Sequence, residues 1–145
     1  MTMNATLESF RQGFPDFLLM TGTAGILLLV ASTIYILLTP WKELALVRGG
    51  NGAAGLALAG AITGLAVPIA SCLASSLTLV DLLLWGSVAL LLQLLTYRII
   101  DMILRDIPTR IQNDEAGAAI VLIAAKLSVA MLLAAGLWDP NIGRV

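Results

Sequence analysis

One basic side chain lies deep inside an apolar stretch of this sequence. Lys126 is near the middle of residues 115–137, where the only other charged residue is Glu115 at the very start. A lysine at the centre of a membrane-spanning helix costs about 2.5–3.5 kcal/mol on insertion scales, so such residues usually face a bundle interior or water and mark functional sites. Lys126 is therefore the first candidate for chemistry.

Two uncharged polar residues in other apolar stretches are candidates to share this site. Helical side chains lean toward the helix N-terminus, which brings the Lys126 ammonium toward the level of Gln93 on a neighbouring helix. Together with Thr63, these residues predict a polar intramembrane site that binds an anion or holds two subunits together. The alternative is a lysine that reaches the interface or contacts backbone carbonyls and has no function.

Other residue types that support catalysis are scarce. The sequence has no His and one Cys, Cys72, and no acidic residue deep in an apolar stretch. General acid–base catalysis usually needs His or paired carboxylates, and a Cys nucleophile needs a base. We therefore expect no enzyme activity, no metal site and no cofactor.

The composition is that of a membrane protein. Of the 145 residues, 59% are hydrophobic and 12% charged, against about 25% charged in a soluble domain. Mean hydropathy is +0.98. The net charge of −1 gives no indication of a nucleic-acid partner.

Four apolar stretches are long enough to cross a bilayer. They predict an all-α polytopic membrane protein with four transmembrane helices, arranged as two parallel-repeat helical hairpins. The expected spans are 17–38, 52–74, 81–100 and 115–137. They belong to hairpins 17–76 and 77–138, with charged links at 39–51 and 101–114, an N-terminal lead at 1–16 and a tail at 139–145. We expect Pro15 to limit any helix in the lead and Pro68 to kink the second span.

Three polar residues stand at the ends of expected spans. Asn51 and Asn113 precede the second and fourth spans as N-caps, although they are also placed to line an inner entrance. Asp81 is expected to cap the third span, with an outer vestibule as the alternative.

Small residues recur along the second span and predict close helix packing. These are Ala53, Ala57, Gly60, Ala61 and Gly64. Whether they pack within one chain or between chains is left open by the sequence.

The basic residues predict the orientation. Five lie in the links or at their edges, and two on the opposite side: Lys42, Arg48, Arg98, Arg105 and Arg110, against Arg11 and Arg144. The positive-inside rule then places both links in the cytoplasm and both termini outside.

The two halves of the chain also resemble each other at an offset of 62 residues. Tyr35 then aligns with Tyr97 and Asn51 with Asn113, while Lys126 aligns with Gly64. Because each unit contains two spans, the copies should be related by a pseudo-twofold axis along the membrane normal. Two hairpins made similar by shared constraints would give the same pattern.

The stretch 39–95 resembles a bacterial membrane family, domain of unknown function 350, the YjfL-like inner membrane proteins. The residues that carry the resemblance are Thr39-Pro40, Glu43, Leu46, Asn51, Ala53-Ala54, Leu56-Ala57, Gly60, Gly64, Pro68, Asp81, Trp85-Gly86 and Gln93-Leu94-Leu95. The resemblance implies a bacterial inner membrane protein of four spans and implies no reaction.

Two functions remain open at this point. The first is an oligomeric membrane scaffold or accessory subunit of the cell envelope, most simply a homodimer, with the charged links available to a cytoplasmic protein partner. The second is a small channel or transporter with a polar site at the repeat interface. A water-lined cavity reaching Lys126 would favour the second function, and a sealed bundle the first.

Overall fold

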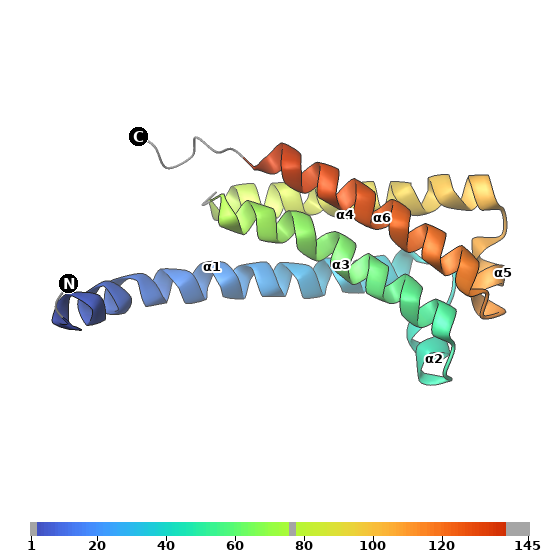
Figure 1. Cartoon of the computed structure of the whole chain (residues 1–145), viewed down its shortest axis with the longest axis horizontal. Coiled ribbons are helices and arrows are strands. Elements are labelled where there is room, and N and C mark those ends of the chain that lie inside the picture. Colours follow the sequence, from blue (N-terminus) through green and yellow to red (C-terminus); the bar gives the residue numbers. More distant parts are fainter. Residues whose placement is uncertain (1–2, 76–77, 139–145) are drawn as a thin grey trace.

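The computed structural model describes residues 3–75 and 78–138, and Figure 1 shows their path. The helices in chain order are α1 (Met3–Leu38), α2 (Glu43–Arg48), α3 (Gly52–Ala74), α4 (Leu79–Leu104), α5 (Ile107–Gln112) and α6 (Ala116–Leu137). Helices α1, α3, α4 and α6 are long and apolar enough to cross a membrane. The expected all-α polytopic membrane fold is confirmed.

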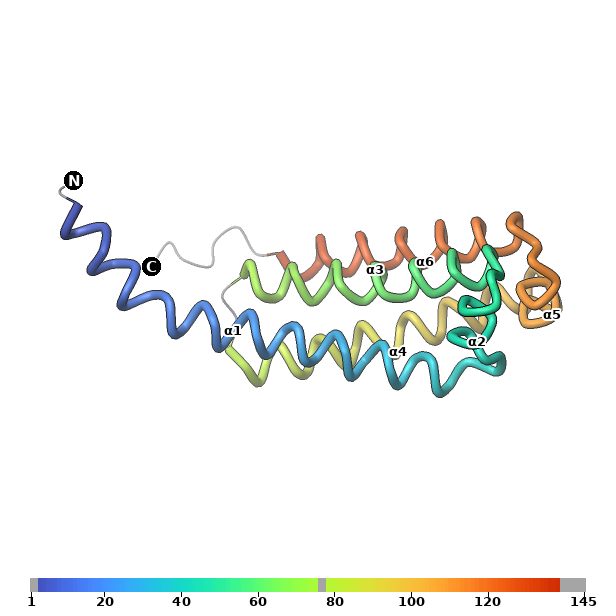
Figure 2. The backbone as a smooth tube through the Cα atoms, turned by 90° about the horizontal axis from the view of Figure 1, so that it is seen from below, coloured from blue at the N-terminus to red at the C-terminus, as the bar shows by residue number. Residues whose placement is uncertain are grey.

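The four long helices form one bundle with the two short helices at the same end (Figures 1 and 2). We call this the link end, because α2 connects α1 to α3 and α5 connects α4 to α6. The N-terminus of α1 and the C-terminus of α6 lie toward the opposite end. Both halves thus have the order long, short and long helix, and their relation by a pseudo-twofold axis stays a prediction.

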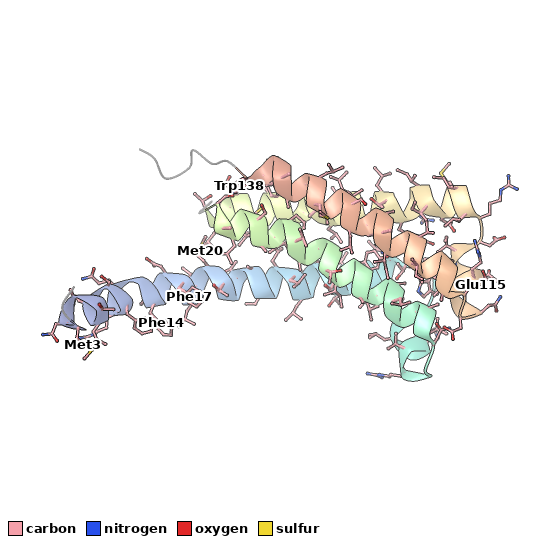
Figure 3. All side chains as sticks on the ribbon, viewed as in Figure 1. Met3, Phe14, Phe17, Met20, Glu115 and Trp138 are labelled. Atoms are coloured by element: carbon pink, nitrogen blue, oxygen red, sulfur yellow. The ribbon has the colours of Figure 1, made fainter. Side chains whose placement is uncertain are left out.

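Helix α1 is longer than the sequence led us to expect. It runs from Met3 to Leu38 with Pro15 inside it, so the expected limit at Pro15 is wrong. Proline removes one backbone donor, but the loss is local and the helix continues through it. The 36 residues span about 54 Å at 1.5 Å per residue. The N-terminal part, with Phe14 and Phe17, extends past the other helices (Figure 3).

Helices α3 and α6 pack closely because their facing residues are small. Ala53 and Ala57 pack in one buried cluster with residues of α6, whereas Ala61 packs with residues of α1 and the buried Gly64 faces Gln93 of α4. A Cβ atom on Gly60 would lie 2.6 Å from Cγ1 of Ile123 on α6. The small residues of α3 therefore pack within one chain, which answers the question left open by the sequence.

The helix ends use the expected polar residues in different ways. Asn51 is the N-cap of α3, and its side chain accepts a 2.7 Å hydrogen bond from the Ala54 N–H. Asp81 is the third residue of a capping box whose N-cap is Thr78. Asn113 is not the N-cap of α6, because Glu115 holds that position. The cause is Asp114, whose left-handed backbone (φ 59°) delays the start of α6.

Helix α4 differs from its expected span 81–100 at both ends and begins at Leu79, whereas α3 has the expected bounds. Helix α4 continues to Leu104, so residues 101–104 of the expected link are helical. Helix α3 continues through Pro68 to Ala74. Side chains join α3 to the second half of the chain at both ends: Asn51 Nδ2 donates to the carbonyl of Ile111 on α5 (2.9 Å), and Ser71 Oγ donates to the carbonyl of Ala134 on α6 (2.8 Å).

Candidate functional site

Lys126 lies inside the bundle with no exposed surface. Its ammonium donates a hydrogen bond to the hydroxyl of Tyr35 on α1. The ammonium also lies 3.9 Å from the centre of the Tyr35 ring, a cation–π geometry that is strongest where water is excluded. The buried lysine therefore has a defined partner within the chain and does not reach the interface.

Gln93 on α4 lies beside the Lys126 backbone. Its Nε2 donates to the carbonyl of Lys126 and to the carbonyl of Gly64, each at 3.1 Å. A Cβ atom on Gly64 would lie 2.9 Å from this Nε2, so glycine leaves the space that the amide fills. Gln93 thus joins α3, α4 and α6 at one level of the bundle.

Thr63 does not belong to this site. Its side chain is exposed, and its hydroxyl donates to the Ala59 carbonyl of its own helix at 2.7 Å. Thr63 precedes Gly64, and successive residues on a helix point about 100° apart. The prediction that Thr63 contacts Lys126 and Gln93 is therefore wrong.

Glu43 is the acidic residue of the site, although the sequence placed it in the charged link 39–51. It opens α2 and has no exposed surface. Neither carboxylate oxygen has a hydrogen-bond partner among the described residues. The pKa of Glu43 is raised to about 7, chiefly because burial removes the carboxylate from water. The Lys126 charge and the Trp41 indole act in the opposite direction and lower this pKa, although the indole N–H does not complete a hydrogen bond.

Trp41 and Tyr97 complete the cluster at the link end. Their rings pack edge to face with centroids 5.3 Å apart, and both side chains are buried. The Trp41 Nε1–H and the Tyr97 hydroxyl have no hydrogen-bond partner among the described residues. We call Tyr35, Trp41, Glu43, Gln93, Tyr97 and Lys126 the buried polar cluster.

Sequence reasoning found two members of the cluster, Lys126 and Gln93, and missed Glu43, Tyr35, Tyr97 and Trp41 as site residues. The two tyrosines did carry a signal, because they are identical in the internal repeat. Glu43 also carried one, as a residue of the family resemblance. Only the fold shows that the first turn of α2 points into the bundle.

A pocket of about 450 Å³ opens at the link end, between the end of α1 and α2. Its walls include Thr39, Trp41 and Glu43, together with the basic residues Lys42 and Arg48. Lys126 is not among the residues that line it. The pocket thus reaches the outer side of the buried polar cluster and stops before the lysine.

The arrangement offers few ligands for a metal ion. Within residues 3–75 and 78–138, no group of three or more His, Cys, Asp or Glu side chains is placed to hold one. The cluster instead contains one carboxylate, one ammonium, two phenols, one amide and one indole N–H, which suits hydrogen bonding and proton exchange.

Four apolar spans around an interior polar cluster define a multi-pass α-helical membrane protein. The chain belongs to the DUF350 family, since the family model described as Domain of Unknown Function (DUF350) matches residues 9–137. This confirms the family resemblance found in the sequence.

Two curated relatives bear the name UPF0719 inner membrane protein YjfL, one from Escherichia coli strain K12 and one from Escherichia coli O157:H7. Each is 30% identical over 95 residues, which is 66% of this chain and 72% of the relative. No solved structure matches the chain. The similarity and the four spans identify a multi-pass inner membrane protein.

Proposed function

We propose that this protein is a non-enzymatic, oligomeric membrane scaffold or accessory subunit of the cell envelope. The observation that carries the proposal is the closed interior of the bundle. Lys126, Gln93 and Tyr35 have no exposed surface, and the pocket at the link end does not extend to Lys126. A bundle without an open path to its buried lysine is suited to holding other chains.

The exposed part of α1 supports the oligomeric part of this proposal. Only Ala24, Ala31 and Tyr35 of its 36 residues are buried. Phe10 and Phe14 stack with centroids 4.9 Å apart on the part that extends past the bundle, and both are exposed. A second copy packing along α1 would cover this surface, so a homodimer is the proposed assembly.

We further propose that both links face the cytoplasm, where their basic residues are available to a protein partner, and that both termini are extracytoplasmic. The shared location of α2 and α5 at one end (Figure 1) supports this orientation, because both basic links then lie on one side.

The test of this orientation uses single cysteines in a Cys72→Ser background and a membrane-impermeant thiol reagent. Gln12→Cys should react in intact spheroplasts and Gln112→Cys only after permeabilisation. The reverse pattern would overturn the orientation.

Native mass spectrometry of the protein, extracted gently from its own membrane, tests the scaffold proposal. The expected result is a dimer or a fixed complex with a second protein. Truncation of residues 1–14 should reduce the dimer, whereas Gln112→Ala should leave it intact. A monomer without a partner, extracted from mild and strong detergents alike, would contradict the proposal.

One observation favours the second candidate, a small channel or transporter. Glu43 lines the pocket at the link end and carries a buried carboxylate without a hydrogen-bond partner. Flux measurements in proteoliposomes distinguish the two candidates. A transporter should show flux that is abolished by Glu43→Gln, while a scaffold should show none with either chain.

A further inference from the structure

We propose that Glu43, Tyr35 and Lys126 form a hydrated proton-binding site that exchanges protons with the link side of the membrane only. The site goes beyond the scaffold role, because it assigns a ligand, the proton, to the bundle interior. It requires neither an oligomer nor a protein partner.

Several buried polar atoms lack a hydrogen-bond partner within residues 3–75 and 78–138. Within the buried polar cluster these atoms are both oxygens of Glu43, Oε1 of Gln93, the Tyr97 hydroxyl and the Trp41 Nε1–H; Ser32 Oγ on α1 is a further one outside the cluster. A buried polar group without a hydrogen bond is costly, and buried water commonly supplies the missing bonds. Because this set includes both donors and acceptors, water satisfies it better than a bare cation or anion does.

A basic side chain from the last helix acts on the Glu43 carboxylate. Lys126 on α6 is held in place by its hydrogen bond to Tyr35 on α1. Its charge lowers the pKa of Glu43. Glu43 and Lys126 are not within 4.0 Å of each other, since the only direct ion pair among the described residues is Arg110–Glu115. A separation greater than an ion-pair contact leaves room for water to connect the two groups.

The other elements around Glu43 contribute the remaining titratable groups. Helix α4 contributes Tyr97, and the Arg98 guanidinium lies 5.8 Å from the centre of the Tyr97 ring. The charge of Asp101, on the same helix, also acts on the Tyr97 hydroxyl. Lys42 and Arg48 lie with Glu43 in the walls of the pocket. Helix α3 faces the cluster with the Gly64 carbonyl and buried alanines. Glu43 is thus the carboxylate of a site whose other charged neighbours are basic, apart from Asp101.

Access to the cluster differs between the two ends of the bundle. Glu43, Trp41 and Thr39 line the pocket that opens at the link end. On the other side of the cluster, two groups of buried apolar residues fill the bundle: Ala31, Ala61 and Leu65, and then Ala24, Ile69, Cys72 and Leu82. Water therefore has a short route to Glu43 from the link end and an apolar barrier beyond Lys126.

The exchange itself is a simple proton balance. A proton taken from link-side water binds one carboxylate oxygen of Glu43 and forms the neutral acid, while the Lys126 ammonium keeps its bond to Tyr35. Release of the same proton to link-side water restores the carboxylate and its attraction to Lys126. No bond other than the O–H bond of Glu43 forms or breaks.

The experiment is infrared difference spectroscopy of the full chain in proteoliposomes, titrated between pH 5 and pH 9. The C=O stretch of a protonated carboxyl should be present at low pH, disappear with a midpoint near pH 7, and be absent in Glu43→Gln. Glu115→Gln is the matched control, because Glu115 is exposed and paired with Arg110, and it should retain the band. Identical spectra of the wild type and Glu43→Gln would overturn the proposal.

Two further measurements test the partner and the direction of access. Lys126→Met removes the opposite charge and should move the midpoint upward by about one pH unit or more; an unchanged midpoint would remove Lys126 from the site. In vesicles of known orientation, the band should follow the pH on the link side. A band that follows the pH on the opposite side would overturn the one-sided access. None of these outcomes depends on oligomeric state, so the scaffold proposal is tested separately.

Discussion

The ammonium of Lys126 on α6 donates a hydrogen bond to the hydroxyl of Tyr35 on α1, and it lies 3.9 Å from the centre of that tyrosine ring. The two residues are 91 positions apart in the chain. This contact connects the first membrane-spanning helix to the last. It also gives the buried charge two favourable interactions inside the bundle.

Replacement of Tyr35 by Phe should therefore destabilise the protein. Phe keeps the ring under the ammonium but removes the hydroxyl that accepts its hydrogen bond, and a lost bond to a buried charge costs about 2 kcal/mol. Tyr97→Phe is the matched control, because the Tyr97 hydroxyl has no hydrogen-bond partner among the described residues. Thermal unfolding in detergent should show a larger loss for Tyr35→Phe. Equal losses would show that the Tyr35 hydroxyl does not hold Lys126.

Asn51 and Asn113 should differ in their effect on stability, although they align in the internal repeat. Asn51 caps α3 and also donates to the carbonyls of Ile111 (2.9 Å) and Gln112 (3.1 Å). Asn51→Ala should therefore cost about 1–2 kcal/mol. Asn113 is exposed and follows α5, so Asn113→Ala should cost much less. Unfolding by denaturant of the two variants in the same detergent measures the difference, and similar losses would contradict the assignment.

Gly60→Ala should weaken the packing of α3 against α6. The added Cβ would lie 2.6 Å from Ile123 Cγ1 and 3.2 Å from its Cα, so the helices must separate, at a cost of about 1–3 kcal/mol. Gly55→Ala is the matched control on the same helix, because nothing lies within 4 Å of its Cβ position. The melting temperature should fall for Gly60→Ala and remain or rise for Gly55→Ala. A fall for both would point to a need for glycine in α3 unrelated to α6.

Stability should depend on pH through Glu43. Its pKa is raised from 4.5 to about 7 in the folded protein, so the folded state binds the proton more tightly than the unfolded state does. The stabilisation is then complete below pH 4.5 and is lost as the pH rises to about 7. The wild type should lose up to about 3 kcal/mol relative to Glu43→Gln over this range.

The measurement is the melting temperature of both proteins in detergent at several values of pH between 4 and 8. Glu115→Gln should follow the wild type at every pH, since its carboxylate is exposed and paired with Arg110. A wild type that gains stability relative to Glu43→Gln with rising pH would reverse the sign and contradict the burial of a protonated acid.

The sequence predicted the spans well where hydrophobicity alone decides them. The second span, Gly52–Ala74, has the expected bounds, because Asn51 begins it and a polar turn follows. Lys126 and Gln93 stood out for the same reason, as polar residues within apolar stretches. Their contact depends on the glycine at position 64, which leaves room for the Gln93 amide.

The sequence failed where a side chain's direction depends on tertiary structure. Glu43 lies in a charged link, and nothing local distinguishes it from the neighbouring Lys42. Thr63 is a threonine within an apolar stretch, and its hydroxyl donates to the carbonyl of Ala59 in its own helix. Its polar side chain therefore gave no information about contacts with other helices. Asn113 failed for a backbone reason, the left-handed conformation of Asp114.

The polar bonds at both ends of the α3–α6 pair have a consequence for motion within one chain. At the link end, Asn51 bonds to Ile111 on α5, and Asp114 Oδ1, in the turn that leads into α6, accepts from the Ala53 N–H at 2.7 Å; at the other end, Ser71 bonds to Ala134 on α6. Sliding of α3 along α6 would break the bonds at both ends together. Helix α1 meets the bundle through few buried residues, so swinging it outward costs less. We therefore expect α3 and α6 to move together and α1 to move more easily, with the Tyr35–Lys126 contact as its main polar attachment to the bundle.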